Sequence, residues 1–489
     1  MVDTDGWLRR AGAAMGAVDS GLGQGVERLV VQHHRRRLRR INQRRALDAS
    51  AGGWPGGGWP PRAGNRIEVL IDGAEALPRI ASAIESARRS AWLAGWYFSP
   101  DFHMRPGDST TLRELLAEAA SRIDVRVLAW AGAPLPLFRP DRANVRGVAD
   151  ELRRETQVQV ALDAHERPMH CHHEKLVIID GETAFVGGID LTSSNGDRLD
   201  SPGHPARGSI GWHDVATQLH GPIVGDVAAH YWTRWVEVTG DDLPAVSAPA
   251  PAGDVELQLV RTVPEHIYRR RLPLGEFTIL ESYMRALRAA RTLIYLENQF
   301  LWSPEVIAVL ADKLRNPPDP RFRLLMLLPA RPNSGSDDTR GQLGVLAEAD
   351  GGAGRLLACT LYQRGEDARP VYVHAKVAVV DDRWLTIGSA NLNEHSLFND
   401  SEVNVVAHDP ALARDTRLRL WSEHTGQPAA ELDGEPASVI EQVWRPIAEE
   451  QLERREQDLP LTHQLLRLPH VSRRAEALRG PLSGLLVDG

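Results

Sequence analysis

The sequence predicts an α/β protein built from two similar lobes, each a mixed β-sheet flanked by helices and related by a pseudo-twofold axis. Two observations lead to this fold class. Apolar strand-like segments alternate with helical patterns from about residue 65 onward, and segments of the first half recur in the second half. The 489 residues are 42% hydrophobic and 25% charged, which suits a folded protein of about two to four domains.

The alternation of strand and helix is clearest where the first lobe begins. The hydrophobic pattern predicts a strand over Arg66–Asp72, a helix over Ala74–Arg89 and a buried strand over Ala91–Phe98. Strands alternating with helices are typical of layered α/β folds, in which helices cover a central sheet.

The repeated segments define the two lobes. Three pairs match: Ser86–Phe98 with Arg288–Phe300 at an offset of 202 residues, Met169–Leu191 with 370–392 at 201, and His213–Pro222 with Ser401–Pro410 at 188. The first lobe therefore carries 13 extra residues between its last two segments. A period this long is not that of a solenoid and indicates a duplicated lobe of about 180 residues.

Composition shifts divide the chain into five regions. We expect a basic N-terminal helical segment with a Gly/Pro/Trp linker (1–64), a first lobe (65–240), a Pro/Ala-rich linker (241–253), a second lobe (254–430) and a C-terminal helical extension (431–489). Residues 1–50 carry a net charge of +5, whereas the whole chain carries −8. The arginine-rich stretch His33–Arg45 predicts either a helix ordered against the acidic body or attraction to anionic lipid headgroups.

Composition also excludes several classes of protein. The acidic body argues against a protein whose main task is to bind nucleic acid. Cys171 and Cys359 are too few for a disulfide framework or a four-cysteine zinc site, and they fit a reducing compartment. There is no run of about 18 apolar residues and no secretory pattern at the N-terminus, so we expect a cytoplasmic monomer that is at most peripheral at the inner membrane face.

The pattern His-x-Lys-x-x-x-x-Asp occurs once in each lobe, as His173, Lys175 and Asp180 and as His374, Lys376 and Asp381. Only three of the 57 basic residues are lysine, and two of these three lie in the motifs. A compact ammonium is therefore expected to matter at both positions. Aliphatic residues after each lysine predict a buried strand, on which histidine and lysine share one face. The two aspartates should face elsewhere, as structural charge partners at the strand ends.

A histidine beside a lysine, present twice, suits the cleavage of a phosphodiester. Two ammonium groups can neutralise the non-bridging oxygens as charge builds up. One imidazole can attack phosphorus to form a phosphohistidine, while the other protonates the leaving oxygen and then activates the acceptor. This chemistry requires the two lobes to meet face to face, so the active site is expected at their interface.

The doubled motif resembles the phospholipase D superfamily over about residues 65–426. In the second lobe the pattern continues with Gly388, Ser389, Asn391 and Glu402, the last where family members place a carboxylate that orients the histidine. The first-lobe counterparts are Gly187, Gly188, Asp190 and Asp214. The segments GGIDL, WHDV and ENQF (Glu297–Phe300) resemble phospholipases D of the eukaryotic kind and their bacterial relatives.

The resemblance implies a set of site residues and their roles. The catalytic candidates are His173, Lys175, Asp180, His374, Lys376 and Asp381, and the candidates for phosphate binding or support are Gly188, Asp190, Asp214, Ser389, Asn391 and Glu402. His173 is expected to be the nucleophile, and His374 the general acid and then the base. Catalysis is expected to need no metal and no other cofactor.

A cluster of possible metal ligands, His165, His170, Cys171, His172 and His173, raises zinc as an alternative. On a strand, Cys171 and His173 would face one side, and His170 and His172 the other. No three adjacent residues would then converge, so we expect no metal site there.

The resulting expectation is a phospholipase D that hydrolyses the distal phosphodiester of a glycerophospholipid at a membrane surface, with water or an alcohol as acceptor. A phosphatidyl transferase such as a cardiolipin synthase is the first alternative, although those usually carry N-terminal transmembrane helices. A nuclease of the same superfamily and a non-catalytic membrane-surface module are the others.

Overall fold

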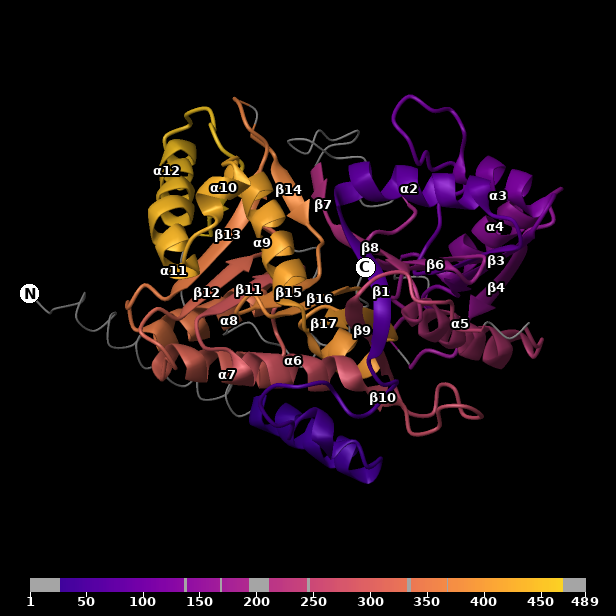
Figure 1. Cartoon of the computed structure of the whole chain (residues 1–489), viewed down its shortest axis with the longest axis horizontal. Coiled ribbons are helices and arrows are strands. Elements are labelled where there is room, and N and C mark those ends of the chain that lie inside the picture. The colour runs from indigo at the N-terminus through magenta and orange to yellow at the C-terminus, as the bar shows by residue number, and fades with distance from the viewer. Residues whose placement is uncertain are drawn as a thin grey trace, which may run out of the picture.

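The structure is a computed structural model that describes residues 27–135, 139–167, 169–192, 211–243, 247–331, 336–366 and 368–468. Two β-sheets lie side by side, and helices cover both faces of each (Figure 1). The predicted fold class, two similar α/β lobes in one chain, is confirmed. Residues 1–26 of the basic segment, 193–210 with most of the first lobe's extra residues, and 469–489 of the extension lie outside the described residues.

The first lobe is built on a sheet with the strand order β1-β8-β6-β5-β2-β3-β4. Its strands are β1 (Arg62–Ile71), β2 (Ser90–Gly95), β3 (Asp124–Trp130), β4 (Gln159–Asp163), β5 (Leu176–Ile179), β6 (Thr183–Gly187) and β8 (Val215–His220), with β7 (Gly211–His213) just before β8. Strands β2, β3 and β4 run parallel, whereas the other neighbours are antiparallel.

The second lobe repeats this arrangement in the order β9-β17-β16-β15-β11-β12-β13. Its strands are β9 (Val255–Val263), β11 (Leu293–Glu297), β12 (Arg323–Leu327), β13 (Leu356–Tyr362), β15 (Val377–Val380), β16 (Trp384–Gly388) and β17 (Glu402–Ala407), with β10 (Glu276–Phe277), β14 (Pro370–Val373) and β18 (Leu465–Arg467) added. Order and strand directions match those of the first lobe, as the repeats predicted.

Helices cover the two sheets in a corresponding way. They are α2 (Asp72–Ser86), α3 (Leu112–Ala120), α4 (Arg142–Arg153) and α5 (Ile223–Thr239) in the first lobe, and α6 (Thr278–Ala289), α7 (Pro304–Arg315), α8 (Ser336–Asp350) and α9 (Pro410–Thr425) in the second. In Figure 1, α2–α4 lie above the first sheet and α5 below it, whereas α6 and α7 lie below the second sheet and α9 above it. This inversion is what a twofold relation between the lobes requires.

Burial on both faces explains the uniformly apolar strands. The face of the first sheet beneath α2–α4 has its own core, and the face of the second sheet beside α6–α8 has another. The opposite faces, with α5 and α9, form one continuous core that runs across both lobes. A strand that is covered on both faces has a continuous apolar sequence, whereas a strand with one exposed face alternates polar and apolar residues.

Local signals set the helix ends. Thr111 and Glu114 form a capping box at α3, and Asp141 and Asn144 form one at α4. Helix α5 ends at Gly240, whose φ of 78° is in the left-handed region that glycine adopts most readily. The three elements predicted at the start of the first lobe correspond to β1, α2 and β2, with boundaries displaced by a few residues.

Two features cross the region boundaries expected from composition. Strand β1 begins at Arg62, inside the predicted linker, and pairs with both β8 and β9. Strand β18 lies in the C-terminal extension but pairs with β13, so this part of the extension completes the second sheet. The extension otherwise contains short helices α10 (Ala429–Leu432) and α11 (Pro436–Val439), a π-helix (Ile440–Trp444) and α12 (Arg445–Glu456).

The arginine-rich stretch is a helix over residues 27–40, followed by a short 3₁₀-helix (Arg44–Ala46). Its buried side chains hold it to the second lobe: Arg37 pairs with Glu265 at 2.7 Å, and His34 stacks on Phe398. None of the helices in the described ranges has both the length and the apolar character needed to cross a membrane.

Candidate active site

The two motif histidines meet at the boundary between the lobes. The rings of His173 and His374 lie edge to face, with 6.3 Å between their centroids, and both residues are buried. Each precedes a strand, β5 or β15, rather than lying on it, so the expectation of a motif within one strand was wrong for its first residues. The expectation that the duplicated lobes bring the two histidines together agrees with this geometry.

A carboxylate from the opposite lobe contacts each histidine. Nδ1 of His173 lies 3.1 Å from Oε1 of Glu402, and Nδ1 of His374 lies 2.6 Å from Oδ2 of Asp214. Sequence reasoning grouped Asp214 with His173 and Glu402 with His374, as members of the same lobe. That grouping was wrong, because the carboxylates are exchanged.

Backbone pairing across the lobe boundary causes the exchange. The N–H of His173 donates to the carbonyl of Ser401 at 2.9 Å, next to Glu402. The N–H of His374 donates to the carbonyl of His213 at 2.8 Å, next to Asp214. Strands β7 and β14 also pair in parallel across the boundary, which fixes the second contact. Each histidine is therefore held by a backbone hydrogen bond next to the carboxylate of the other lobe.

The surroundings of the two carboxylates differ. Ser389 and Ser396 each donate a hydroxyl hydrogen bond of 2.5 Å to Glu402. Burial raises the pKa of Glu402 to about 8, although Lys175 and the two hydroxyls oppose that rise. In the first lobe the position of Ser389 is Gly188, where a Cβ atom would lie 2.2 Å from Oδ1 of Asp214. A side chain at residue 188 would thus displace the partner of His374.

The two lysines also have unequal partners. The Nζ atoms of Lys175 and Lys376 donate to the carbonyls of His173 and His374, which draws each ammonium beside its histidine. Lys175 further lies 3.5 Å from Oδ2 of Asp190, a carboxylate. The lysines therefore reach the same small volume as the histidines, as the motif predicted.

Lys376 has a neutral partner where Lys175 has a charged one. Its Nζ donates to Oε1 of Gln299 at 3.2 Å, and Asn391 donates to the same oxygen at 3.3 Å. Burial lowers the pKa of Lys376 to about 7; Asp214 opposes this shift and the charge of Lys175 adds to it. An anion that approached Lys376 would add to the counter-charge that Asp214 supplies.

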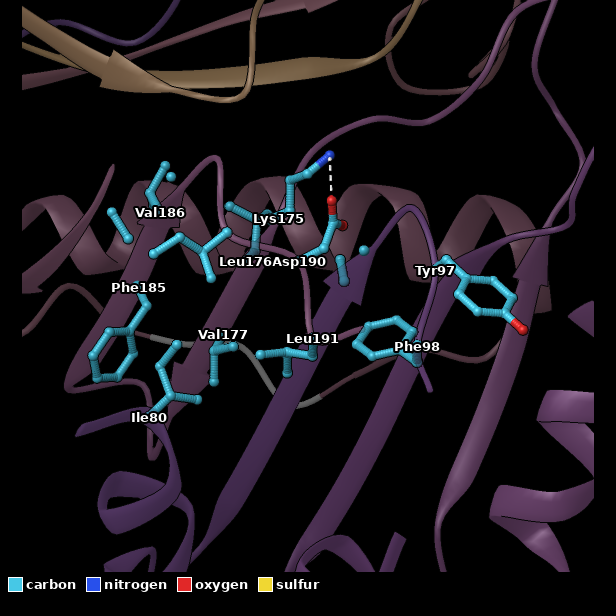
Figure 2. Close-up of a pocket in the computed structure, with 15 residues that line it drawn as sticks. Ile80, Tyr97, Phe98, Lys175, Leu176, Val177, Phe185, Val186, Asp190 and Leu191 are labelled. Atoms are coloured by element: carbon cyan, nitrogen blue, oxygen red, sulfur yellow. Dashed lines mark ion pairs between the residues drawn. The ribbon is translucent and has the colours of Figure 1, made fainter. Parts of the chain in front are cut away.

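Figure 2 shows where the charged pair of the first lobe lies. Lys175 and Asp190 point toward each other at one side of a small pocket. Apolar side chains, among them Phe98, Val177 and Phe185, line the rest of it. The space is about 20 Å³, room for about one water molecule. The apolar side chains that line the pocket beside the ion pair belong to the first lobe.

The two motif aspartates lie away from the histidines and are structural. Asp180 accepts hydrogen bonds from the backbone N–H groups of Arg88, Arg89 and Ser90. Asp381 accepts the equivalent bonds at the start of β11. Each carboxylate thus ties the strand after a lysine motif to the neighbouring helix–strand turn. The expectation of charge partners at the strand ends agrees with these contacts, and a catalytic role for either aspartate stays a prediction.

A buried charge network beside Asp214 was missed from the sequence. His213 lies 2.8 Å from both Asp72 and Glu297, and Glu297 also lies 2.8 Å from His424. Burial opposes protonation, but Asp72 and Glu297 raise the pKa of His213 well above its usual value. Glu297 and Gln299 belong to the ENQF segment at the end of β11. Polar residues at the carboxyl end of a buried strand are typical of functional sites in α/β folds, so this position could have marked both residues as candidates.

Known proteins are similar to both halves of this chain. Residues 360–472 match the family described as phospholipase D, and residues 80–199 match the PLD-like domain of cardiolipin synthase. Phospholipase D A of Dictyostelium discoideum is 24% identical over 75% of this chain and 36% of its own length. Phospholipase D alpha 1 of Oryza sativa subsp. japonica is 25% identical over 73% of this chain and 65% of its own.

The fold has a counterpart among solved structures. Phosphatidylserine synthase of Haemophilus influenzae Rd KW20 superimposes with a TM-score of 0.54 at 15% identity, covering 86% of this chain and 98% of that one. Fold and site together define a two-lobed protein with a paired-histidine centre. Both halves of the chain are thus similar to members of the phospholipase D superfamily. It spans between about a third and two thirds of the two phospholipases D above.

Proposed function

We propose that the protein is a phospholipase D that cleaves the distal phosphodiester of a glycerophospholipid through a phosphohistidine. The observation that carries this proposal is the pairing of His173 with His374 across the interface, each with a carboxylate on Nδ1 and a lysine alongside. A carboxylate on Nδ1 orients the ring and directs the reaction to Nε2. Ring centroids 6.3 Å apart leave room for one phosphorus centre between them.

The first step transfers the phosphatidyl group to the enzyme. Nε2 of His173 attacks phosphorus, the bond to the headgroup oxygen breaks, and His374 gives its proton to that oxygen. Lys175 and Lys376 neutralise the charge that builds up on the non-bridging oxygens. The products of this step are a phosphatidyl–His173 adduct and a free headgroup alcohol.

The second step releases the lipid. His374, now neutral, takes a proton from water, and the resulting hydroxide attacks phosphorus as the P–N bond breaks. Phosphatidic acid leaves and both histidines return to their initial states. An alcohol in place of water would give a new phosphatidyl ester by the same path, so transphosphatidylation requires no further catalytic group.

A phosphatidyl transferase of the cardiolipin synthase kind is the second candidate. The observation that favours it is the match of residues 80–199 to the cardiolipin synthase domain. The two candidates use the same adduct and differ in the acceptor, which is water in one case and a lipid hydroxyl in the other.

We further propose that the protein acts as a monomer at the cytoplasmic face of a membrane. The chain has two cysteines, too few for a disulfide framework, which suits a reducing compartment. The helix over residues 27–40 turns Arg35, Arg36, Arg39 and Arg40 outward while Arg37 and Leu38 face the second lobe. This basic face is suited to anionic headgroups.

Intact-protein mass spectrometry with a p-nitrophenyl phosphatidyl ester tests the proposal. His374→Ala should accumulate the adduct, because p-nitrophenolate leaves without a proton while water is no longer activated. His173→Ala should form none. An adduct on His173→Ala and none on His374→Ala would reverse the roles, and an adduct on neither would contradict a long-lived phosphohistidine. Product analysis with phosphatidylcholine, phosphatidylglycerol and a nucleic-acid substrate then separates hydrolase, transferase and nuclease.

A further inference from the structure

Three side chains with metal-binding atoms meet at the lobe boundary outside the catalytic pair. Nδ1 of His170, from the first lobe, lies 3.0 Å from Nδ1 of His395 and 3.3 Å from Oδ1 of Asp400, both from the second lobe. The three ligand atoms all lie within 4.8 Å of one another. The sequence indicated no convergence at His170, because its companions come from a segment more than 200 residues away.

The cluster has bonding capacity that the protein does not use. Asp400 is fully buried, and while its Oδ1 accepts the backbone N–H of Cys171 at 2.9 Å, its Oδ2 has no hydrogen-bond partner. His395 is 2% exposed, and its Nε2 is also without a partner. Nδ1 of His170 faces two possible acceptors, Nδ1 of His395 and Oδ1 of Asp400, and one hydrogen must be shared between them. A cation between the three atoms would accept a lone pair from each, while Nε2 of His395 and Oδ2 of Asp400 lie outside that contact.

The spacing fits a small transition-metal ion. Zinc–nitrogen and zinc–oxygen bonds of about 2.0–2.1 Å at tetrahedral angles place neighbouring ligand atoms about 3.3 Å apart. The distances of 3.0 and 3.3 Å at His170 are close to that value. The side chain of His170 is 15% exposed, which leaves a route for the ion and a fourth, solvent-side position. Two imidazoles with one carboxylate suit zinc rather than the oxygen-preferring magnesium or calcium.

Another histidine–carboxylate cluster lacks such a route. His213, Glu297 and His424 also place ligand atoms within 4.8 Å of one another, but the side chains of all three have no exposed surface. That cluster already contains direct 2.8 Å contacts between histidine and carboxylate. It is explained as a buried charge network, and so is the overlapping group of Asp72, His213 and Glu423, in which His213 already lies 2.8 Å from Asp72. Among the described residues, the site at His170 is then the candidate for an ion.

We propose that His170, His395 and Asp400 bind one Zn²⁺ ion through Nδ1, Nδ1 and Oδ1, and that the ion clamps the two lobes beside the active site. The segments it would join are already in register: Ser401 donates its N–H to the carbonyl of Cys171 at 3.1 Å, and His173 donates to Ser401 at 2.9 Å. The ion would therefore hold the Glu402 strand against His173 without touching the substrate.

Metal titration of the full-length protein tests the site. After chelator treatment, isothermal calorimetry with Zn²⁺ should give one ion per chain, and Zn²⁺ but not Mg²⁺ should raise Tm. His170→Ala and His395→Ala, one from each lobe, should each weaken Zn²⁺ binding by at least about tenfold. His463→Ala, a histidine on the C-terminal segment, should bind like the wild type.

A second measurement keeps the test independent of stability. Co²⁺ added to the metal-free protein should produce the visible absorption of a tetrahedral site, and folded His170→Ala and His395→Ala should lack it. If neither variant folds, His170→Asn and Asp400→Asn replace them. The proposal is overturned if the wild type binds no Zn²⁺, which would leave a hydrogen-bonded histidine pair. It is equally overturned if folded variants from both lobes bind Zn²⁺ as the wild type does.

Discussion

Glu402 lies 3.1 Å from Nδ1 of His173, although the two residues are 229 positions apart and belong to different lobes. The reciprocal pair, Asp214 and His374, is 160 positions apart. Neither lobe therefore holds a complete histidine–carboxylate unit. In the proposed mechanism, the nucleophile depends on the second lobe for its orientation, and the general acid depends on the first.

The exchange of carboxylates predicts which step each variant slows. Asp214→Asn removes the anionic partner of His374, so cleavage of a choline ester should slow by about 10²–10⁴-fold, the usual contribution of a general acid. Adduct formation from a p-nitrophenyl ester should be nearly unchanged, because that leaving group needs no proton. Glu402→Gln should slow adduct formation from both esters. Rapid-quench measurement of the adduct gives the rates, and the opposite pattern would support pairing within each lobe.

The two motif lysines should not be replaceable by arginine. Lys175 and Lys376 are buried beside the histidines, where a planar guanidinium is too large and holds its donors in a fixed fork. Each substitution to arginine should cost about 2–4 kcal/mol of transition-state stabilisation, seen as a loss of kcat/KM. Lys313→Arg is the matched control, because Lys313 lies on α7 and its Nζ donates to the carbonyls of Arg288 and Ala290 at the end of α6. Turnover of either motif variant at the control's rate would contradict the prediction.

The low pKa of Lys376 predicts a pH dependence. Its ammonium form binds phosphate and predominates below about 7, so kcat/KM should fall as pH rises through that value in the free enzyme. Bound phosphate stabilises the ammonium, so the fall in kcat should occur at higher pH. Asn391→Asp would place a carboxylate where Asp190 lies in the first lobe and should move the fall in kcat/KM upward. An identical profile in this variant would show that another group controls it.

The aspartate of the second motif should matter for stability rather than chemistry. Asp381→Ala leaves the N–H groups of Arg291, Thr292 and Leu293 without their shared acceptor. The free energy of unfolding should fall by about 2–3 kcal/mol, as expected for lost hydrogen bonds to a charged group. Chemical denaturation measures this loss, with Asp415→Ala on the exposed surface of α9 as control. The remaining folded protein should still form the adduct, and its failure to do so would return Asp381 to the catalytic set.

The basic face of the N-terminal helix should bind anionic bilayers. Deleting the whole segment would also remove the buried Arg37, so charge reversal of exposed residues is the cleaner change. Arg36→Glu with Arg40→Glu should weaken binding to phosphatidylglycerol vesicles at low salt, by about 1 kcal/mol or more per residue. Turnover of a soluble short-chain substrate should not change. Arg146→Glu with Arg154→Glu, at α4, is the matched control, and equal loss in both would indicate a non-specific charge effect.

The duplicated α/β architecture and the two lysine motifs could be recognised in the sequence. Both depend on information carried locally: apolar runs of strand length, recurring segments at a constant offset, and lysines retained in a chain otherwise biased to arginine. The order of the strands in the second sheet follows from the first because the lobes are copies. The boundaries were less well predicted: β1 begins inside the expected linker and also pairs with β9 of the second lobe, and β18, in the expected extension, joins the second sheet.

The pairing of each histidine with its carboxylate could not be predicted in this way, because it depends on how the two lobes pack. Glu402 reaches His173 because the Ser401 carbonyl accepts the His173 N–H across the lobe boundary, and no local period encodes that register. Gln299 beside Lys376, and His395 and Asp400 beside His170, were hidden for the same reason. Contacts between residues hundreds of positions apart arise from how two lobes pack, and that packing is set by a shared core rather than by any single motif.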